Sequence, residues 1–85
     1  NTWNVFKEAF DSADNNFLKK VKENHPSLTP NDLRLCAYLR LNLSSKEIAP
    51  LINISVRSIE IKRYRLRKKM NLPHETGLVE YLLSI

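Results

Sequence analysis

Glycine, cysteine and long apolar runs are all scarce in this chain of 85 residues, which has one glycine, Gly77, and one cysteine, Cys36. β-Hairpins and phosphate-cradling loops both rely on glycine, so we expect neither. A composition rich in Leu, Lys, Arg, Asn and Ile predicts an all-α fold. A lone cysteine allows no internal disulfide and no cysteine-based zinc site, which fits a reducing, cytoplasmic setting. No apolar run approaches the roughly 20 residues that span a bilayer, and no signal peptide is visible.

Positive charge is concentrated late in the chain. The formal net charge is +5; residues 1–55 hold seven Lys or Arg against six Asp or Glu, whereas residues 56–85 hold seven against three. All seven late cations fall between Arg57 and Lys69. A basic small domain indicates a polyanionic partner, although charge alone does not separate DNA from RNA or an acidic membrane.

The first 27 residues are predicted to form a helical extension that links to an upstream domain. Trp3, Phe6 and Phe10 recur at helical spacing, and Phe17 begins a second apolar stripe after a polar break. We expect these aromatic residues to serve core or dimer packing. Because the chain starts at Asn1 rather than Met, it is expected to be a piece of a longer protein.

Residues 28–85 form the predicted main domain, and its first two helices carry clear start signals. Thr29 is a good N-cap, with Pro30 at the first helical position, and this helix should run to about Leu41. Asn42 can adopt the left-handed conformation that ends a helix. Ser44 and Glu47 form a capping box that opens a short helix, which Pro50 should distort or shorten rather than break.

Two further helices complete the predicted main domain. Asn53-Ile54 makes a tight turn, after which Ser55 caps a helix that runs to about Asn71. A last helix should begin at about Glu75. Four helices of this kind, with the second and third joined by a short turn, are typical of a helix-turn-helix domain.

A helical wheel of residues 55–71 separates an apolar side from a cationic side. Ile59, Leu66 and Met70 share the expected core face. The opposite face carries Arg57, Ile61, Tyr64, Arg65 and Lys68, with Glu60 at its border and Lys62, Arg63, Arg67 and Lys69 on the flanks. This pattern suits a helix inserted between phosphates, with flanking cations on the backbone and the outer face on base edges.

The segment from Leu28 to Leu72 resembles the LuxR/GerE family of helix-turn-helix effector domains. The resemblance rests on a series of short matches in order and spacing: Leu28-Thr29, Asp32, Leu35-Cys36, Ser45-Lys46-Glu47-Ile48-Ala49, Ile54-Ser55, Ser58-Ile59, Leu66 and Lys69-Met70. It implies a tetrahelical bundle and sequence-specific binding of duplex DNA as a homodimer by a bacterial transcription regulator. The last helix corresponds to the family's usual dimer contact, which would involve Leu78, Val79 and Leu82.

Site residues follow partly from the resemblance and partly from the wheel. By resemblance, Glu60, Ile61 and Tyr64 would face bases, and Lys46, Ser55, Ser58, Lys62 and Lys69 would contact phosphates. The wheel adds Arg57 and Arg65 to the base-facing group and Lys68 to the phosphate group. Glu60 stands where Lys is frequent in the family, so it would either accept from cytosine N4 or hold Arg63 or Tyr64 in place.

The amino-acid sequence around Ser45 and around Arg63 is also similar to that of one branch of the family. That branch forms the cytoplasmic tail of membrane-spanning sensor-regulators from Bacteroides-like bacteria, which carry periplasmic β-propeller and triple-tyrosine domains. The similarity implies a membrane link only through an upstream part of the parent protein. The aromatic stretch from Trp3 to Phe17 is similar to the segment that precedes the helix-turn-helix there.

Other interpretations remain beside this one. The basic helix could be only a solvated face of a protein-interaction module that docks through its first and last helices, or the domain could resemble sigma region 4. Tyr64 could pack on a neighbouring helix, and Glu60 could be only a helix partner. Cys36 is expected to be an inert core residue, and His25 and His74 to be loop residues without a metal. We find no catalytic arrangement and expect neither an enzyme nor a cofactor.

Overall fold

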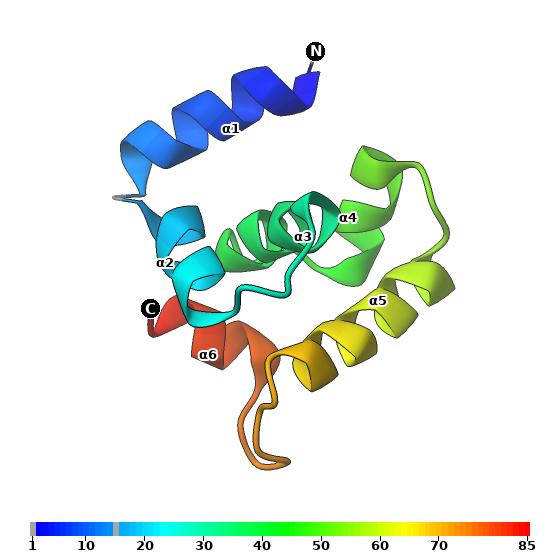
Figure 1. Cartoon of the computed structure of the whole chain (residues 1–85). Helices are drawn as coiled ribbons and strands as arrows, with labels where there is room; N and C mark the ends of the chain where they lie inside the picture. Colours follow the sequence, from blue (N-terminus) through cyan, green and yellow to red (C-terminus); the bar gives the residue numbers. More distant parts are fainter. Residues whose placement is uncertain (1, 15) are drawn as a thin grey trace.

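The computed structural model describes residues 2–14 and 16–85, which form six helices and, within these ranges, no strand. The helices are α1 (Thr2–Ala13), α2 (Phe17–Asn24), α3 (Pro30–Arg40), α4 (Ser45–Ile52), α5 (Val56–Lys69) and α6 (Leu78–Leu83). In Figure 1, α3 occupies the centre, α4 and α5 lie on one side of it and α2 and α6 on the other, and α1 crosses above. The all-α prediction is confirmed.

Three helices begin at the predicted N-caps. The Thr29 hydroxyl accepts from the Asp32 N–H at 3.2 Å, and the Thr29 N–H donates to the Asp32 carboxylate at 2.9 Å. Ser44 and Glu47 form the same reciprocal pair at 3.1 and 2.8 Å. Each box satisfies two N–H groups that helix geometry leaves without a partner. Ser55 caps α5 by accepting from the Ser58 N–H at 3.1 Å.

Asparagine ends the helices in a chain with so little glycine. Asn42, Asn53 and Asn71 follow α3, α4 and α5 with φ of 62°, 62° and 53°. Asparagine tolerates this left-handed region better than other residues with a Cβ. The prediction for Asn42 is confirmed, and Asn53 makes the predicted turn between α4 and α5.

The predicted end of α5 was wrong by two residues, and the predicted start of α6 by three. Helix α5 stops at Lys69 because its final carbonyls bond to the turn: the Leu72 N–H donates to the Arg67 carbonyl at 3.2 Å and the Asn71 N–H to the Lys68 carbonyl at 3.0 Å. Helix α6 begins at Leu78, not Glu75. The segment before it is a turn, in which the Arg67 guanidinium bonds the carbonyls of Pro73 and Thr76 at 3.0 and 2.5 Å.

Helix α4 runs through Pro50 without a break, as predicted. Proline is exposed there, so its ring meets solvent and only one backbone donor is lost.

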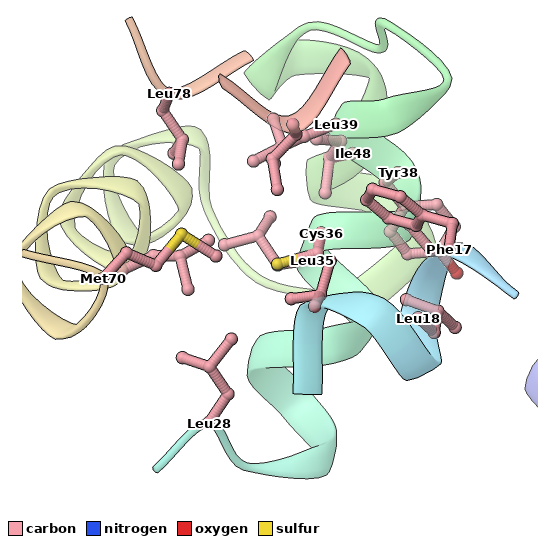
Figure 2. Close-up of a cluster of buried hydrophobic side chains, with 14 of the residues drawn as sticks. Phe17, Leu18, Leu28, Leu35, Cys36, Tyr38, Leu39, Ile48, Met70 and Leu78 are labelled. Carbon is pink, nitrogen blue, oxygen red and sulfur yellow. The ribbon is translucent and has the colours of Figure 1, made fainter. Parts of the chain in front are cut away.

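The core surrounds α3. Its residues Cys36, Ala37 and Leu39 are fully buried, and α3 packs against both α2 and α6, while α4 packs against α5. Figure 2 shows side chains from the other helices converging on this centre, with Leu28 and Met70 pointing into it from the start of α3 and the end of α5. Burial raises the pKa of the Cys36 thiol to about 12, so this residue is the inert core cysteine expected.

The N-terminal extension belongs to the same core. Phe10, Phe17 and Val21 are buried in it, and the rings of Trp3 and Phe6 lie 5.9 and 5.3 Å from that of Tyr38 on α3. The extension expected to act as a linker therefore packs as part of the bundle. Its aromatic side chains serve the core.

Helix α6 also faces inward. Leu78 is 6% exposed and Leu82 is 0% exposed, because both pack beneath α3. Both side chains therefore belong to the core of the single chain, and the contact of Leu78, Val79 and Leu82 with a second copy stays a prediction. Val79 is partly buried, whereas Leu83 on the same helix is 51% exposed.

Candidate nucleic-acid interface

The helix pair α4–α5 presents one side of α5 to solvent. Ile48 and Ala49 of α4 are buried against α5, whose Ile59 and Leu66 are fully buried. A connection of three residues, 53–55, joins the two helices. The predicted inner face of α5 is confirmed, with Met70 just beyond the helix end also buried.

The opposite face of α5 is open over its whole length. Tyr64 is 59% exposed and Ile61 is 40% exposed. The remaining residues predicted there are exposed as well: Arg57, Glu60, Arg65 and Lys68. The face combines three cations, one carboxylate, one aromatic ring and one aliphatic side chain, a mixture suited to reading polar edges and methyl groups.

Tyr64 is partnered from within its own helix. The Lys68 ammonium lies 4.9 Å from the centre of the Tyr64 ring, and its interaction with the hydroxyl raises the pKa of Lys68. At 59% exposed, Tyr64 is largely uncovered by the neighbouring helices. Together with Arg67, Asn71, Leu72 and His74, the two residues line an open hollow of about 500 Å³ beside the loop after α5.

The flanking cations divide into an exposed group and an engaged group. Lys62 and, at the start of α4, Lys46 are exposed, as is the cap residue Ser55. Arg63 is engaged, because it donates to the hydroxyl of Ser45 at 3.2 Å. Since Ser45 is the buried polar residue of α4, this bond joins the two helices of the pair.

Three other site predictions have distinct surroundings. Ser58 is half-buried and bonds Ser55 through its hydroxyl at 3.0 Å. Lys69 forms an ion pair with Asp32 at 2.6 Å, so its ammonium already has an anion. Glu60 makes no ion pair or hydrogen bond with any described residue, which leaves the predicted partnership with Arg63 or Tyr64 unsupported.

Sequence reasoning missed several residues that shape this surface. Val56, the first residue of α5, is 39% exposed, and it lies within the range of the helical wheel, where its apolar side chain was not assigned to the outer face. Arg34 of α3 donates to the Leu51 carbonyl at 3.1 Å, next to the α4–α5 turn, and its guanidinium lies 5.1 Å from the Trp3 ring. No local pattern indicates this contact, because the partners are far apart in the sequence.

The two histidines lie in different surroundings. His25 Nε2 lies 2.6 Å from the Tyr81 hydroxyl and ties the turn before α3 to α6, while His74 is exposed in its loop. Across residues 2–14 and 16–85, no three His, Cys, Asp or Glu residues gather as a metal site. Within the same ranges, none of the helices has both the length and the apolar character that a bilayer crossing requires.

Comparisons with known proteins agree with this geometry. Residues 26–82 match the GerE profile, described as bacterial regulatory proteins of the luxR family. The chain is 35% identical over 81 residues to a probable transcriptional regulator, ycf29, of Pyropia yezoensis, an alignment that covers 94% of this chain and 36% of the relative. It is 31% identical over 66 residues to the transcriptional regulatory protein MctR of Rhizobium johnstonii, covering 78% and 31% respectively.

The chain thus spans about a third of the length of these curated relatives. No solved structure matches it. The family match covers well over half of the chain and contains the whole α4–α5 pair. The chain therefore belongs to the luxR family of bacterial regulatory proteins, and α4 and α5 are its helix-turn-helix.

Proposed function

We propose that this domain binds duplex DNA in a sequence-specific manner, with α5 in the major groove, as the output domain of a bacterial transcription regulator. The observation that carries the proposal is the sidedness of α5: Ile59 and Leu66 are fully buried, whereas Ile61 and Tyr64 are exposed between cations. At 14 residues, α5 is about 21 Å long, and a major groove about 12 Å wide admits such a helix.

Base contacts would come from the outer face of α5. Arg57 and Arg65 can donate to guanine O6 and N7, and the free carboxylate of Glu60 can accept from cytosine N4. Ile61 and Val56 offer apolar surface to a thymine methyl group. Tyr64, held by Lys68, supplies a ring and a hydroxyl in the middle of the face.

Phosphate contacts would flank this face and fix the register of the helix. Lys46, Ser55, Ser58, Lys62 and Lys68 are the candidates, with the N–H groups at the start of α5 beside Ser55. Lys69 differs from these because of its pair with Asp32.

The proposal includes a homodimer on DNA, in which two copies of α5 read two half-sites. On α6 the partly buried Val79 and the exposed Leu83 are the apolar side chains with surface for this contact, because Leu78 and Leu82 lie in the core of each chain. The alternative of a protein-interaction module loses its main docking surface, because Phe10 and Phe17 are buried and the Trp3 and Phe6 rings pack on Tyr38. A link to a membrane-spanning parent protein stays a prediction.

The test is selection of bound duplexes from a random DNA pool. Fluorescence anisotropy titrations then compare binding to the selected duplex with binding to a scrambled one. We expect a recurrent half-site, repeated with two-fold symmetry if the domain dimerises on DNA. Tyr64→Ala should weaken binding to the selected duplex by about 1–3 kcal/mol and reduce the preference over the scrambled duplex.

Charge variants separate base contact from phosphate contact. Lys62→Gln should weaken binding to both duplexes alike and reduce the salt dependence by about one phosphate. Lys19→Gln removes the same charge from an exposed position on α2 and should leave both titrations nearly unchanged. Enrichment of no motif, with equal losses for Lys62→Gln and Lys19→Gln, would count against the proposal.

A further inference from the structure

The Asp32–Lys69 pair joins two elements at the edge of the proposed DNA surface. Lys69 Nζ lies 2.6 Å from Asp32 Oδ2, which connects the last residue of α5 to the first turn of α3. Leu28, directly before the Thr29 cap of α3, and Met70, directly after Lys69, are both buried in the core (Figure 2). The core therefore anchors the backbone beside each partner of the pair.

The pair also lies in a cationic cleft. Asp32 and Lys69 line a cleft of about 230 Å³ with Thr29, Asn31, Lys62 and Arg65. Three cations and one carboxylate face it. Lys62 and Arg65 are exposed on α5, so a DNA backbone that lies along this flank meets this cleft.

Asp32 remains charged under ordinary conditions. Partial burial alone would raise the pKa of this carboxyl, but hydrogen bonds from Lys69 and from the Thr29 backbone and side chain lower it overall. The carboxylate and a DNA phosphate therefore compete for the same ammonium group. The Asp32 carboxylate has an advantage in this competition, because it belongs to the same chain as Lys69 and binds the ammonium without the loss of translational freedom that binding a separate molecule requires.

We propose that Asp32 is a positioning residue that holds Lys69 away from the DNA backbone and so reduces the number of phosphates this flank neutralises. The inference rests on the proposed function and deepens it. Without Asp32, Lys69 would join Lys62 as a second phosphate contact in the cleft. The pair thus limits the sequence-independent part of DNA affinity, which is the part that counterion release supplies.

The experiment measures binding of the selected duplex by anisotropy between 50 and 300 mM salt for the unmodified chain and four variants. Asp32→Asn keeps an oxygen that can accept from the Thr29 N–H and frees Lys69. We expect the slope of log affinity against log salt to steepen by about 0.9, with affinity roughly 8-fold higher at 0.1 M salt. Asp32→Ser, a second neutral variant, should behave alike, and circular dichroism checks the folding of each protein.

The double variant Asp32→Asn/Lys69→Gln should return to the slope and affinity of the unmodified chain, because the paired charges cancel in that chain. Asp11→Asn is the matched control: it frees Lys7 from a carboxylate 3.5 Å away on α1, with the same change in net charge. We expect an unchanged slope for this variant.

A different pattern of slopes would contradict the role proposed for Asp32. If Lys69 contacts a phosphate while Asp32 is a bystander, Asp32→Asn leaves the slope unchanged and the double variant is shallower than the unmodified chain by about 0.9. That outcome overturns the inference alone, since salt-dependent binding persists. If neither the unmodified chain nor Asp32→Asn binds duplex DNA at 50 mM salt, the proposed function fails and this inference fails with it.

Discussion

At the scale of single residues, Arg40 shows how one side chain joins three segments of the chain. Its guanidinium bonds both carboxylate oxygens of Asp14, at 3.1 and 3.2 Å, and the carbonyls of Leu82 and Ile85 near the C-terminus. Its carbon Cζ also lies 4.7 Å from the centre of the Phe17 ring. The side chain thus connects the end of α1, the start of α2 and the end of α6.

Arg40→Ala should lower the free energy of unfolding by about 2–4 kcal/mol, because it leaves a half-buried carboxylate and two carbonyls without their donor. Urea unfolding followed by circular dichroism measures the loss. Lys7→Ala breaks the exposed Lys7–Asp11 pair and should cost no more than about 0.5 kcal/mol. Equal losses in the two variants would show that Arg40 is only a surface charge.

The lowered pKa of Asp32 predicts a pH-dependent contribution to stability. A carboxyl whose pKa is lower in the folded state stabilises the fold above its unfolded pKa, and the contribution disappears as pH falls through the folded pKa. Asp32→Asn should therefore melt below the unmodified chain at pH 7, and the gap between the two melting temperatures should close in acid. A gap that stays constant down to pH 2 would contradict this assignment.

At the scale of helices, Pro50 is the one residue of α4 that works against its element. It lies in the second turn, where it removes the donor that would bond the Lys46 carbonyl. Pro50→Ala should raise the free energy of unfolding by about 2 kcal/mol, since helix propensity improves by more than the unfolded chain gains in entropy.

Pro26→Ala is the matched control for this change. Pro26 lies between α2 and α3, outside any helix, so its replacement only frees the unfolded chain. A small loss of at most about 1 kcal/mol is expected. The prediction fails if both substitutions shift the urea midpoint in the same direction.

How far the sequence predicted these elements depends on how local each signal is. The caps at Thr29, Ser44 and Ser55 involve partners three residues away, so their patterns were readable and the helix starts were confirmed. The inner face of α5 was also predictable, because the spacing of its apolar residues is a local pattern within one helix. The start of α6 was missed, because Arg67 bonds the preceding turn from another element.

Apolar periodicity identifies a buried face but not what covers it. The family resemblance assigned Leu78 and Leu82 to a dimer contact, whereas in the fold of the single chain both side chains are buried against α3. The Asp32–Lys69 pair spans 37 residues of sequence, and no spacing rule connects such partners. The candidate site was therefore predictable as a helix face, whereas the state of its individual cations required the fold.

At the scale of the whole molecule, the folding unit is larger than the segment that matches the family. The match begins at residue 26, but Phe17, Leu18 and Val21 are at most 5% exposed and lie in the same core as α3. The α1 and α2 helices are therefore expected to be needed for stability.

A chain truncated to residues 26–85 should lose roughly 5–9 kcal/mol, since each of the three side chains contributes about 1.5–3 kcal/mol by its burial. A small domain has about 5–15 kcal/mol in total, so we expect little or no cooperative unfolding transition. Truncation to residues 14–85 removes only α1 and should leave a weaker but cooperative transition. Full stability of the 26–85 chain in urea would refute the single-core account.

The central claim is that the outward face of α5 is the surface that meets DNA. The most direct measurement is a backbone NMR titration of the labelled chain with the selected duplex. The account predicts that chemical-shift changes gather from Ser55 to Lys69 and at the start of α4, while α1 and α2 change little. Changes concentrated on α1 and α6, with α5 unaffected, would contradict it.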